Sequence, residues 1–215
     1  MSMQHRWIGS IVLVLLVQTI PTQAEDPDDT RQLLETRKCS GCDLRRVDLS
    51  FADLSGVNLK KADLYEANLS GANLSGTNLR EANFDGANLT KANLTETDLR
   101  EASLTLADLS EADLSGANLD RANLEIARLS RSNLNNANLT QANLSHVKLD
   151  RASLNGANLS DADFREADLS YTNLDGANLS GTYLWRANLE GARLTGVNLC
   201  GATLPDGTVS QQGCS

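Results

Sequence analysis

A large apolar residue recurs at every fifth position from Leu44 to Leu204, without a single insertion or deletion. The series has 33 members: 31 are leucine, and Phe84 and Phe164 are phenylalanine. A helix turns roughly 100° per residue and would scatter these side chains around its circumference, whereas a flat strand would place alternate members on opposite faces. The chain must therefore turn once per repeat, and self-similarity at a fixed period outweighs local propensity.

Two further positions of the repeat are nearly as constant. Counted from the central apolar residue, position −2 is alanine in 23 of 33 repeats and otherwise valine, threonine, serine or cysteine; position −1 is asparagine or aspartate in 26. We expect the centre and position −2 to point inward and the other three positions to face solvent. Short Asn and Asp side chains can bond nearby turn backbone and, when stacked, one another, so we interpret them as structural.

The pattern of alanine, asparagine or aspartate, leucine and two variable residues resembles the pentapeptide-repeat family, and residues 72–76 show it directly as ANLSG. The resemblance covers residues 42–206. It implies an all-β solenoid: a right-handed, quadrilateral (four-sided) parallel β-helix with four pentads per coil and about eight coils. With neighbouring strands about 4.8 Å apart, the rod would be about 40 Å long.

The first 24 residues have the pattern of a secretory signal peptide. Arg6 precedes a 14-residue apolar run from Trp7 to Ile20, and Thr22 and Ala24 suit cleavage after Ala24. The run is shorter than the about 20 apolar residues of a transmembrane helix, so we expect no membrane span in the mature protein. Exported relatives in the resembled family, abundant in cyanobacteria, imply a periplasm or a thylakoid lumen, between which the sequence does not distinguish.

A solenoid exposes unpaired strand edges at both ends, so each end needs a cover. Residues 25–41 supply a linker and a capping helix: residues 28–30 can cap a helix over residues 31–38. Leu33 and Leu34 would then cover the first coil. At the other end, the sequence PDG just after the last repeat centre indicates a stop and a turn before a short polar tail.

Four cysteines lie at the two ends of the expected rod. Cys39 and Cys42 precede or open the first pentad, whereas Cys200 and Cys214 lie in the last repeats and in the tail 207–215. Disulfides need Cα atoms within about 7 Å, which excludes bridges between the two ends. Because export favours oxidation, we predict a Cys39–Cys42 bridge that pins the capping helix and a Cys200–Cys214 bridge that ties down the tail.

Other interpretations of the cysteines stay open. Cys42 occupies an inward position and could be a buried thiol. A Cys-x-x-Cys pair can exchange thiols, although such sites usually begin a helix in a mixed α/β fold. Zinc would need two more nearby ligands, and the one histidine of the mature chain, His146, lies several coils away. We predict no metal and no cofactor.

Taking every fourth pentad together gives four faces: face 1 through Leu44, face 2 through Leu49, face 3 through Leu54 and face 4 through Leu59. Face 1 carries eight acidic and four basic residues, and faces 2, 3 and 4 carry six and five, four and one, and five and five. No face is strongly of one sign. On face 2, position −1 holds Asp108, Arg128, Lys148 and Asp168 in successive coils, which we interpret as a surface charge ladder.

Face 1 has the only notable outward apolar residues. Leu106 and Ile126 stack on adjacent coils, and Tyr183 and Trp185 lie near the end of the rod, with Trp185 above Arg165. We predict this face as the partner surface. The competing interpretation is that scattered apolar side chains on a solenoid have no function.

Catalysis is not expected. An unbroken repeat offers no inserted loop, no cleft and no histidine with an orienting partner, and the many carboxylates follow from the repeat. The sequence therefore favours a non-enzymatic structural or protein-interaction scaffold outside the cytoplasm, with an unknown protein partner.

The resemblance also implies an alternative. Some acidic rods of the family dimerise end to end and occupy the DNA-binding surface of type II topoisomerases such as gyrase. Removal of residues 1–24 would take the net charge from −9 to −10, which suits a DNA mimic and argues against nucleic-acid binding. The export segment and the two nearly neutral faces oppose the mimic. A homodimer through a rod end is a related hypothesis, and a carbohydrate ligand on the bare face 3 lacks an aromatic platform.

Overall fold

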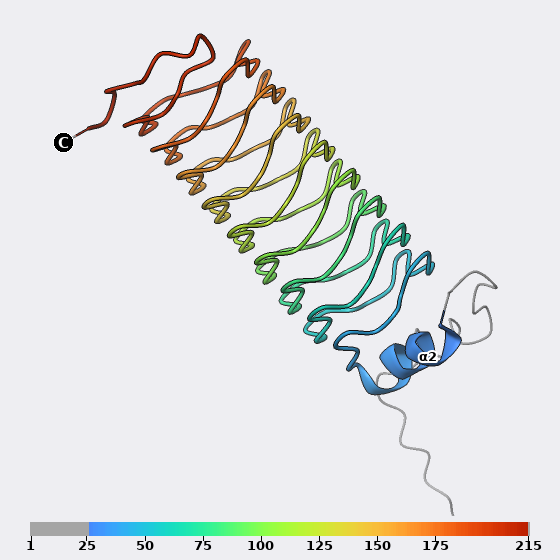
Figure 1. Ribbon diagram of the computed structural model, residues 1–215. Coiled ribbons are helices and arrows are strands. Elements are labelled where there is room, and N and C mark those ends of the chain that lie inside the picture. The colour runs from blue at the N-terminus through green and yellow to red at the C-terminus, as the bar shows by residue number, and fades with distance from the viewer. Residues whose placement is uncertain (1–25, 215) are drawn as a thin grey trace, which may run out of the picture.

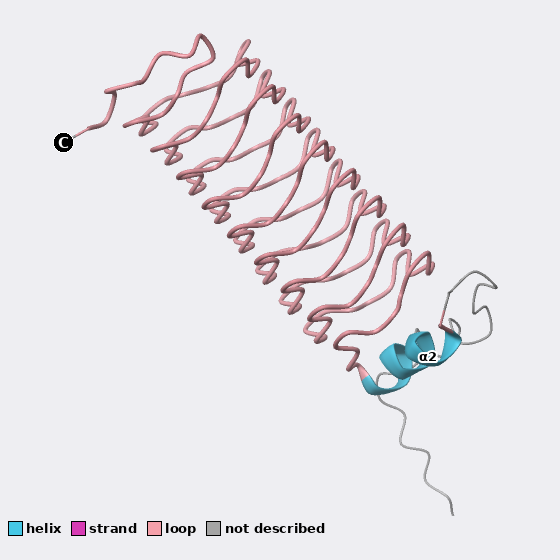
Figure 2. Ribbon diagram, viewed as in Figure 1, coloured by secondary structure: helices cyan, strands magenta, loops and turns pink. Residues whose placement is uncertain are grey.

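The structure is a computed structural model that describes residues 26–214, and it is a rod of stacked four-sided coils with one helix at its N-terminal end (Figure 1). The predicted right-handed quadrilateral β-helix is confirmed. Outside the helix the described chain consists of turns and of extended segments that each contribute one bridging residue (Figure 2). Every bridge of the rod pairs residues 20 apart in parallel, from Lys38 with Asn58 to Tyr183 with Thr203. Four pentads therefore make one coil.

A pentad inside the rod with Asn or Asp at position −1 gives all five of its backbone N–H groups an acceptor, as residues 72–76 illustrate. The N–H at position −2 closes a turn onto the preceding centre, and the N–H at position −1 donates to the preceding coil. The N–H groups of the centre and of position +2 donate to the following coil. The N–H at position +1 donates to the side-chain oxygen at position −1. Asparagine and aspartate thus accept from the N–H at position +1, the one backbone donor of the pentad that has no backbone acceptor.

Positions +1 and +2 form the turns at the corners of the coil. Position +2 has a left-handed backbone in every pentad from Arg46 to Gly201, with φ between 53° and 74°. This is the conformation of the second central residue of a type II turn, which favours glycine. Only 11 of these 32 residues are glycine, so most corners carry a side chain in a backbone conformation that costs free energy.

The core is a column of leucine with alanine around it. The centres and the residues at position −2 are buried almost throughout, as predicted from the repeat. Where position −2 is threonine or serine, its buried hydroxyl donates to a leucine carbonyl, as Thr77 Oγ1 does to Leu54 O at 3.1 Å. Packing loosens only in the last coil, where Leu189, Leu194 and Leu204 are partly exposed.

Helix α2 (Pro27–Thr36) covers the first coil. It begins and ends earlier than the predicted 31–38: Asp26 is the N-cap and accepts from the N–H groups of Asp28 and Asp29, and Pro27 opens the helix. Arg37 ends it in a left-handed conformation, which the sequence does not signal because the residue is not glycine. Leu33 and Leu34 are buried against the first coil, as expected.

The tail folds back over only half of the C-terminal end. After a turn closed by the Gly207 N–H to the Leu204 carbonyl, the chain pairs antiparallel through Val209 and Thr203. It then covers face 4, where Leu199 donates to Gln212 O at 3.0 Å. Across faces 2 and 3 the last coil lacks such a cover within residues 26–214: the N–H groups at the repeat centres 189 and 194 have no backbone acceptor.

The predicted signal peptide, residues 1–24, lies outside the described residues. Within residues 26–214 no helix has both the length and the hydrophobicity to cross a bilayer, and α2 has 10 residues.

Candidate functional site

The exposed large apolar side chains are confined to half of the circumference. Among the described residues they are Phe51, Tyr65, Leu106, Ile126, Tyr171, Tyr183, Trp185 and Val209. Val209 lies in the tail, and the other seven belong to pentads of faces 1 and 2. Faces 3 and 4 contribute none within residues 26–214. The rod therefore has one half-surface with apolar groups and one without.

Leu106 and Ile126 stack on adjacent coils at the corner where face 1 turns into face 2. Their side chains are 62% and 46% exposed. Both have a left-handed backbone, with φ of 62° and 61°. For a β-branched residue such as isoleucine this conformation is rare and strained. An exposed isoleucine at a glycine-favouring corner is therefore a departure from what stability alone would select.

Tyr183 and Trp185 lie three coils further along, in the last coil of face 1, so they do not form one patch with Leu106 and Ile126. Trp185 stacks on its neighbour Arg186, whose guanidinium carbon is 4.1 Å from the ring centroid. Arg165, expected beneath the ring, instead holds Asp163, with its Nε 2.9 Å from Oδ1.

Phe51, Tyr65 and Tyr171 are exposed as well, and Phe51 and Tyr171 correct the expectation that only face 1 carries notable outward apolar residues. Phe51 and Tyr171 stand at position +2 of face 2, on its corner with face 3, and Phe51 is 80% exposed. Their rings lie over the glycines of the next coil: a Cβ added at Gly71 would be 2.6 Å from the Phe51 ring, and one at Gly191 would be 2.5 Å from the Tyr171 ring. The sequence does contain a signal for these exposed rings: an aromatic residue at position +2 with a glycine at the same position one coil later.

The Asn and Asp ladders occupy most outward polar groups. In all 26 pentads with Asn or Asp at position −1, the side-chain oxygen accepts from the N–H at position +1, as Asn138 does from Thr140 at 3.2 Å. Many also bond along the rod, as Asn138 Nδ2 does to Asn118 Oδ1 at 3.1 Å. These are the structural bonds predicted from the repeat.

Seven pentads have another residue at position −1, and they show where the ladder is broken. At Ser103, Ser153 and Arg193 an Asp or Asn of the preceding coil supplies the missing acceptor. At Thr203 the next-but-one residue is Pro205, which has no N–H. The other three pentads have Arg128, Lys148 or Tyr183 at position −1. Their N–H groups at position +1, on Ser130, Asp150 and Trp185, have no acceptor within residues 26–214.

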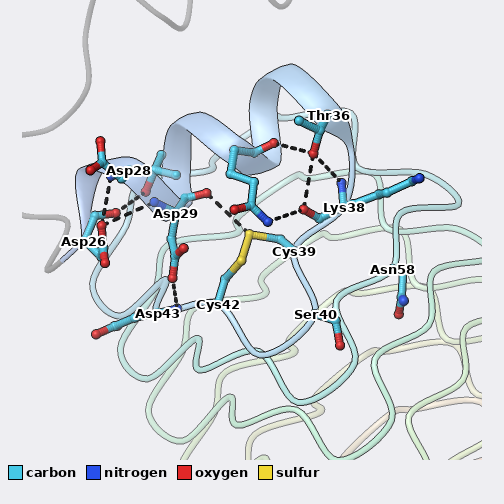
Figure 3. The surroundings of a disulfide bond; sticks show 12 residues. Asp26, Asp28, Asp29, Thr36, Lys38, Cys39, Ser40, Cys42, Asp43 and Asn58 are labelled. Carbon is cyan, nitrogen blue, oxygen red and sulfur yellow. Dashed lines mark hydrogen bonds between the residues drawn. A yellow bond between two sulfur atoms is a disulfide. The ribbon is translucent and has the colours of Figure 1, made fainter.

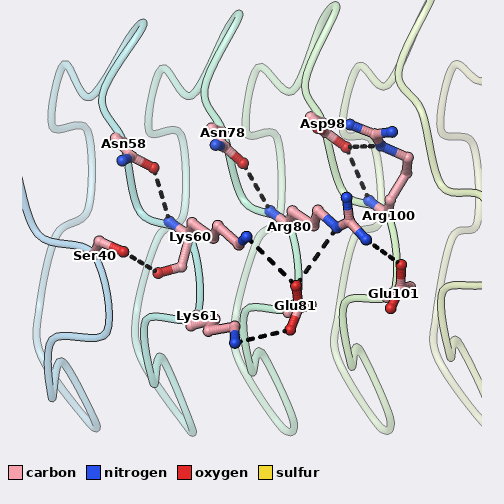
Figure 4. A network of polar contacts seen from close by, with 10 residues as sticks. All are labelled: Ser40, Asn58, Lys60, Lys61, Asn78, Arg80, Glu81, Asp98, Arg100 and Glu101. Atoms are coloured by element: carbon pink, nitrogen blue, oxygen red, sulfur yellow. Dashed lines mark hydrogen bonds and ion pairs between the residues drawn. The ribbon is translucent and has the colours of Figure 1, made fainter.

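Charged side chains on face 4 are largely paired between coils (Figure 4). Glu81 lies 3.7 Å from Lys60 Nζ and 3.5 Å from Arg80 Nε, and Arg80 reaches Glu101 at 2.6 Å. Such exposed pairs contribute little individually but neutralise the face. Face 2 differs: Arg131, Lys148 and Arg151 are exposed and form no ion pair with any residue that the structure describes.

The four cysteines lie as two pairs, one at each end of the rod. Cys39 and Cys42 are bonded beneath α2, where Cys39 Sγ is also 3.3 Å from the Asp29 carbonyl (Figure 3). Cys200 is bonded to Cys214 in the tail. Cys39 and Cys42 are buried, which keeps their sulfur atoms from thiol partners in solution. Their oxidation in the protein stays a prediction.

Carboxyl groups with a lowered pKa accept local hydrogen bonds, several of them from arginine, and do not form a catalytic cluster. Arg100 bonds Asp98 through Nε at 2.7 Å and holds the pKa of that carboxyl below its usual value. Arg45 does the same for the pKa of Asp43. Among the described residues no group of three or more His, Cys, Asp or Glu side chains could hold a metal ion.

Comparisons with known proteins agree with the repeat. The family model for pentapeptide repeats matches residues 42–80, 67–105, 107–145, 142–181 and 167–206. HetL, a pentapeptide repeat protein involved in heterocyst differentiation regulation from the cyanobacterium Nostoc sp. strain PCC 7120, is 36% identical over 80% of this chain and 85% of its own, with a TM-score of 0.27.

Two further solved structures are similar. A pentapeptide repeat protein of the Arabidopsis thaliana thylakoid lumen is 27% identical over 54% of this chain and 71% of its own, with a TM-score of 0.26. Full-length QnrB1, a plasmid-mediated fluoroquinolone resistance protein, is 21% identical over 66% of this chain and 84% of its own, with a TM-score of 0.35. No curated protein sequence matches the chain significantly.

Proposed function

The chain belongs to the pentapeptide-repeat family, and on that basis we propose that it is a non-enzymatic scaffold that docks a protein partner outside the cytoplasm. The observation that carries this proposal is that the repeated Asn and Asp side chains form structural hydrogen bonds within the rod. All 26 Asn and Asp residues at position −1 are committed to turn and ladder hydrogen bonds. A rod built this way offers rigid, regularly spaced surface positions and little chemistry.

The partner surface that we propose on face 1 has two parts. Leu106 and Ile126 form an apolar corner in the middle of the rod, and Tyr183 and Trp185 form an aromatic pair at its end. Tyr183 also stands where Asn or Asp would have satisfied the Trp185 N–H, so the repeat forgoes a structural bond there. Large aromatic side chains are typical anchors of protein interfaces.

The proposed compartment rests on residues 1–24, whose pattern favours export to a periplasm or a thylakoid lumen. Oxidised cysteine pairs would be consistent with such a compartment. Cell fractionation combined with sequencing of the mature N-terminus tests this. Recovery outside the cytoplasm, beginning near Glu25, is expected; recovery in the cytoplasm with Met1 retained would contradict export.

The partner surface is tested by capture from the compartment in which the protein is found. Tyr183→Ser with Trp185→Ser, and separately Leu106→Ser with Ile126→Ser, should each release partners that the unchanged protein retains. Asn155→Ser on face 3 is the control, because it changes an exposed side chain that forms no hydrogen bond among the described residues, on the half-surface without apolar groups. Retention of all partners by both double variants would contradict the proposed surface.

The open half of the C-terminal end supports a homodimer through that end. Its repeat centres 189 and 194 have unpaired N–H groups, and the tail residues 207–214 carry no charge. End-to-end contact would also keep the acidic faces of two copies apart. Light scattering on Leu194→Asp and on the unchanged protein measures this; equal monomer masses at all concentrations would contradict the dimer.

The topoisomerase alternative rests on acidity and rod shape alone, and the charges are dispersed. Face 4 pairs its carboxylates with lysine and arginine, as Glu81 and Glu101 show. A supercoiling assay with mature protein decides: inhibition of a type II topoisomerase at micromolar concentration would replace the scaffold proposal.

A further inference from the structure

Face 2 is bordered on both long edges by exposed apolar side chains. Leu106 and Ile126 stand on its corner with face 1, and Phe51 and Tyr171 stand on its corner with face 3. Phe51 and Tyr171 are six coils apart, which is about 29 Å along the rod at the usual strand spacing. These four side chains project from convex corners rather than lining a groove.

Unpaired cations lie between these two edges. Arg131, Lys148 and Arg151 have no ion-pair partner among residues 26–214, and Arg128 is 3.6 Å from Asp108. All four belong to two adjacent coils of face 2. They are concentrated on a chain whose formal net charge is −9.

Most carboxylates near this surface accept hydrogen bonds but keep their charge, so the net positive charge is confined to residues 127–131 and 147–151, where four cations lie beside one acid, Asp150. On face 2, Asp108 accepts from the Ser110 N–H at 3.0 Å and Asp168 accepts from Asn188 Nδ2 at 3.1 Å. At the corner with face 1, Glu66 pairs with Arg46 at 3.0 Å and Glu166 with Arg186 at 3.8 Å. At the corner with face 3, Glu111 lies 3.8 Å from Lys91. The remaining carboxylates of face 2 also have hydrogen-bond partners: Asp48, Asp150 and Glu190.

The same surface breaks two local rules of the repeat. Arg128 and Lys148 replace the Asn or Asp that would satisfy the N–H groups of Ser130 and Asp150, and they stack like charges on adjacent coils. Ile126, next to Arg128 across one inward alanine, adopts a left-handed backbone at φ 61°. Departures from local structural preference that coincide in one place are expected at functional sites rather than at random.

We propose that face 2, with its two corners, binds the surface of an anionic lipid bilayer, with the rod lying flat on it. Apolar side chains on convex corners can enter the soft boundary between headgroups and acyl chains, whereas a protein partner would have to supply matching grooves. Aromatic residues prefer that boundary, and arginine and lysine bind headgroup phosphates. A protein interface would concentrate its anchors near the centre, but here they are spread along the edges of the face.

The acidic remainder of the rod does not prevent this orientation. Charges more than about 8 Å from the bilayer are largely screened at physiological ionic strength, and face 4 points away from the lipid. Face 2 as a whole carries six acidic and five basic residues, so the attraction comes from residues 127–131 and 147–151, where four cations lie beside one acid. Each cation raises the partition coefficient about fivefold at an anionic surface. We therefore expect binding that weakens as salt increases.

The test is sedimentation of the mature, oxidised chain with vesicles of phosphatidylglycerol and phosphatidylcholine, compared with vesicles of phosphatidylcholine alone. The triple variant Arg131→Asn, Lys148→Asn, Arg151→Asn should bind roughly 100-fold more weakly to the anionic vesicles, because it loses three cations. The control is Lys60→Asn, Lys61→Asn, Arg121→Asn, which changes the net charge equally on the opposite face 4. It should bind the vesicles as the unchanged protein does.

A second variant separates binding from folding. Leu106→Gly with Ile126→Gly should raise the midpoint of thermal unfolding, because glycine adopts the left-handed corner without strain, and should still reduce vesicle binding. Equal losses in the face 2 and face 4 triple variants, or no binding to anionic vesicles, would overturn the proposal. Binding to soluble polyglutamate but not to vesicles would overturn it in favour of an acidic protein partner. The two charge variants change none of Leu106, Ile126, Tyr183 and Trp185, so their vesicle binding is independent of the scaffold proposal.

Discussion

Asp29 accepts a hydrogen bond from the backbone N–H of Asp43, with its Oδ2 2.7 Å from the nitrogen, so the capping helix is held to the first coil by a side chain from inside the helix. The donor is a strand-edge N–H that no preceding coil can satisfy. The contact therefore covers the edge of the solenoid in the way that a further coil would.

Asp29→Ala should lower the free energy of unfolding by about 1–3 kcal/mol, because it leaves a partly buried N–H without an acceptor. Asp28→Ala is the control: it removes a carboxylate from the same helical turn that pairs only with Arg31 on the surface, at 3.2 Å. Urea denaturation of both variants measures the difference. Equal losses would show that Asp29 acts through helix charge rather than through the bond to Asp43.

The Asn ladder gives a second stability prediction. Asn138→Ala removes both the acceptor for the Thr140 N–H and the bond to Asn118, and should cost about 1–3 kcal/mol. Asn138→Asp keeps the acceptor and loses only the donor along the rod, so its cost should be smaller. Thermal unfolding of the two variants distinguishes the turn bond from the ladder bond; a larger loss in the aspartate variant would contradict this division.

The leucine column should be sensitive along its length except at the open end. Leu134 and Leu194 are both centres on face 3, but Leu134 is fully buried and Leu194 is partly exposed in the last coil. In dilute protein, where an end-to-end dimer dissociates, Leu134→Ala should cost about 2–5 kcal/mol through lost contacts and a cavity, and Leu194→Ala less than half as much. Comparable losses would mean that the C-terminal end is covered in solution, as a dimer would cover it.

The fold could be predicted because the side-chain period and the backbone period are the same. A leucine at every fifth position fixes one turn per pentad, so nearly every buried centre was identifiable from sequence alone. The bounds of α2 were predicted wrongly. Asp26 and Pro27 are a good start signal but were assigned to the linker, and the end at Arg37 depends on a left-handed residue that is not glycine.

The candidate site was less predictable, because it depends on which charges are paired. Spacing by 20 residues places Arg165 beneath Trp185, but two-point bonding to Asp163 two residues away holds the guanidinium elsewhere. Phe51 and Tyr171 were not predicted because each stands alone on face 2, with glycine at the same position one coil later. The 20-residue spacing predicts which residues stack on the same face. Which charged groups pair with one another has to come from the structure.

Stability should fall in acid because arginine contacts lower carboxyl pKa values. Arg100 lowers the pKa of Asp98 and Arg45 lowers that of Asp43, so both carboxylates favour the folded state once ionised. A depressed folded-state pKa contributes stability that is complete above the unfolded value, about 3.9, and is lost as the pH falls through the folded value. Asp98→Asn should therefore be less stable than the unchanged protein at pH 7, and the two should converge below the folded pKa. A gap that persists there would exclude ionisation as the cause.

The Cys200–Cys214 pair gives the last prediction. The bridge closes a loop with a sequence separation of 14, for which about 3 kcal/mol of stabilisation is typical. The tail that it holds supplies acceptors for the N–H groups of Leu199 and Gly201, so Cys214→Ser should unprotect those amides selectively in hydrogen exchange. Mass spectrometry of the native mature protein should find no free thiol. Cys42→Ser is the comparison at the other end, where the loss of protection should be confined to α2 and the first coil. Free thiols in freshly isolated protein, or exchange at Leu199 unchanged by Cys214→Ser, would contradict a tail held by oxidation.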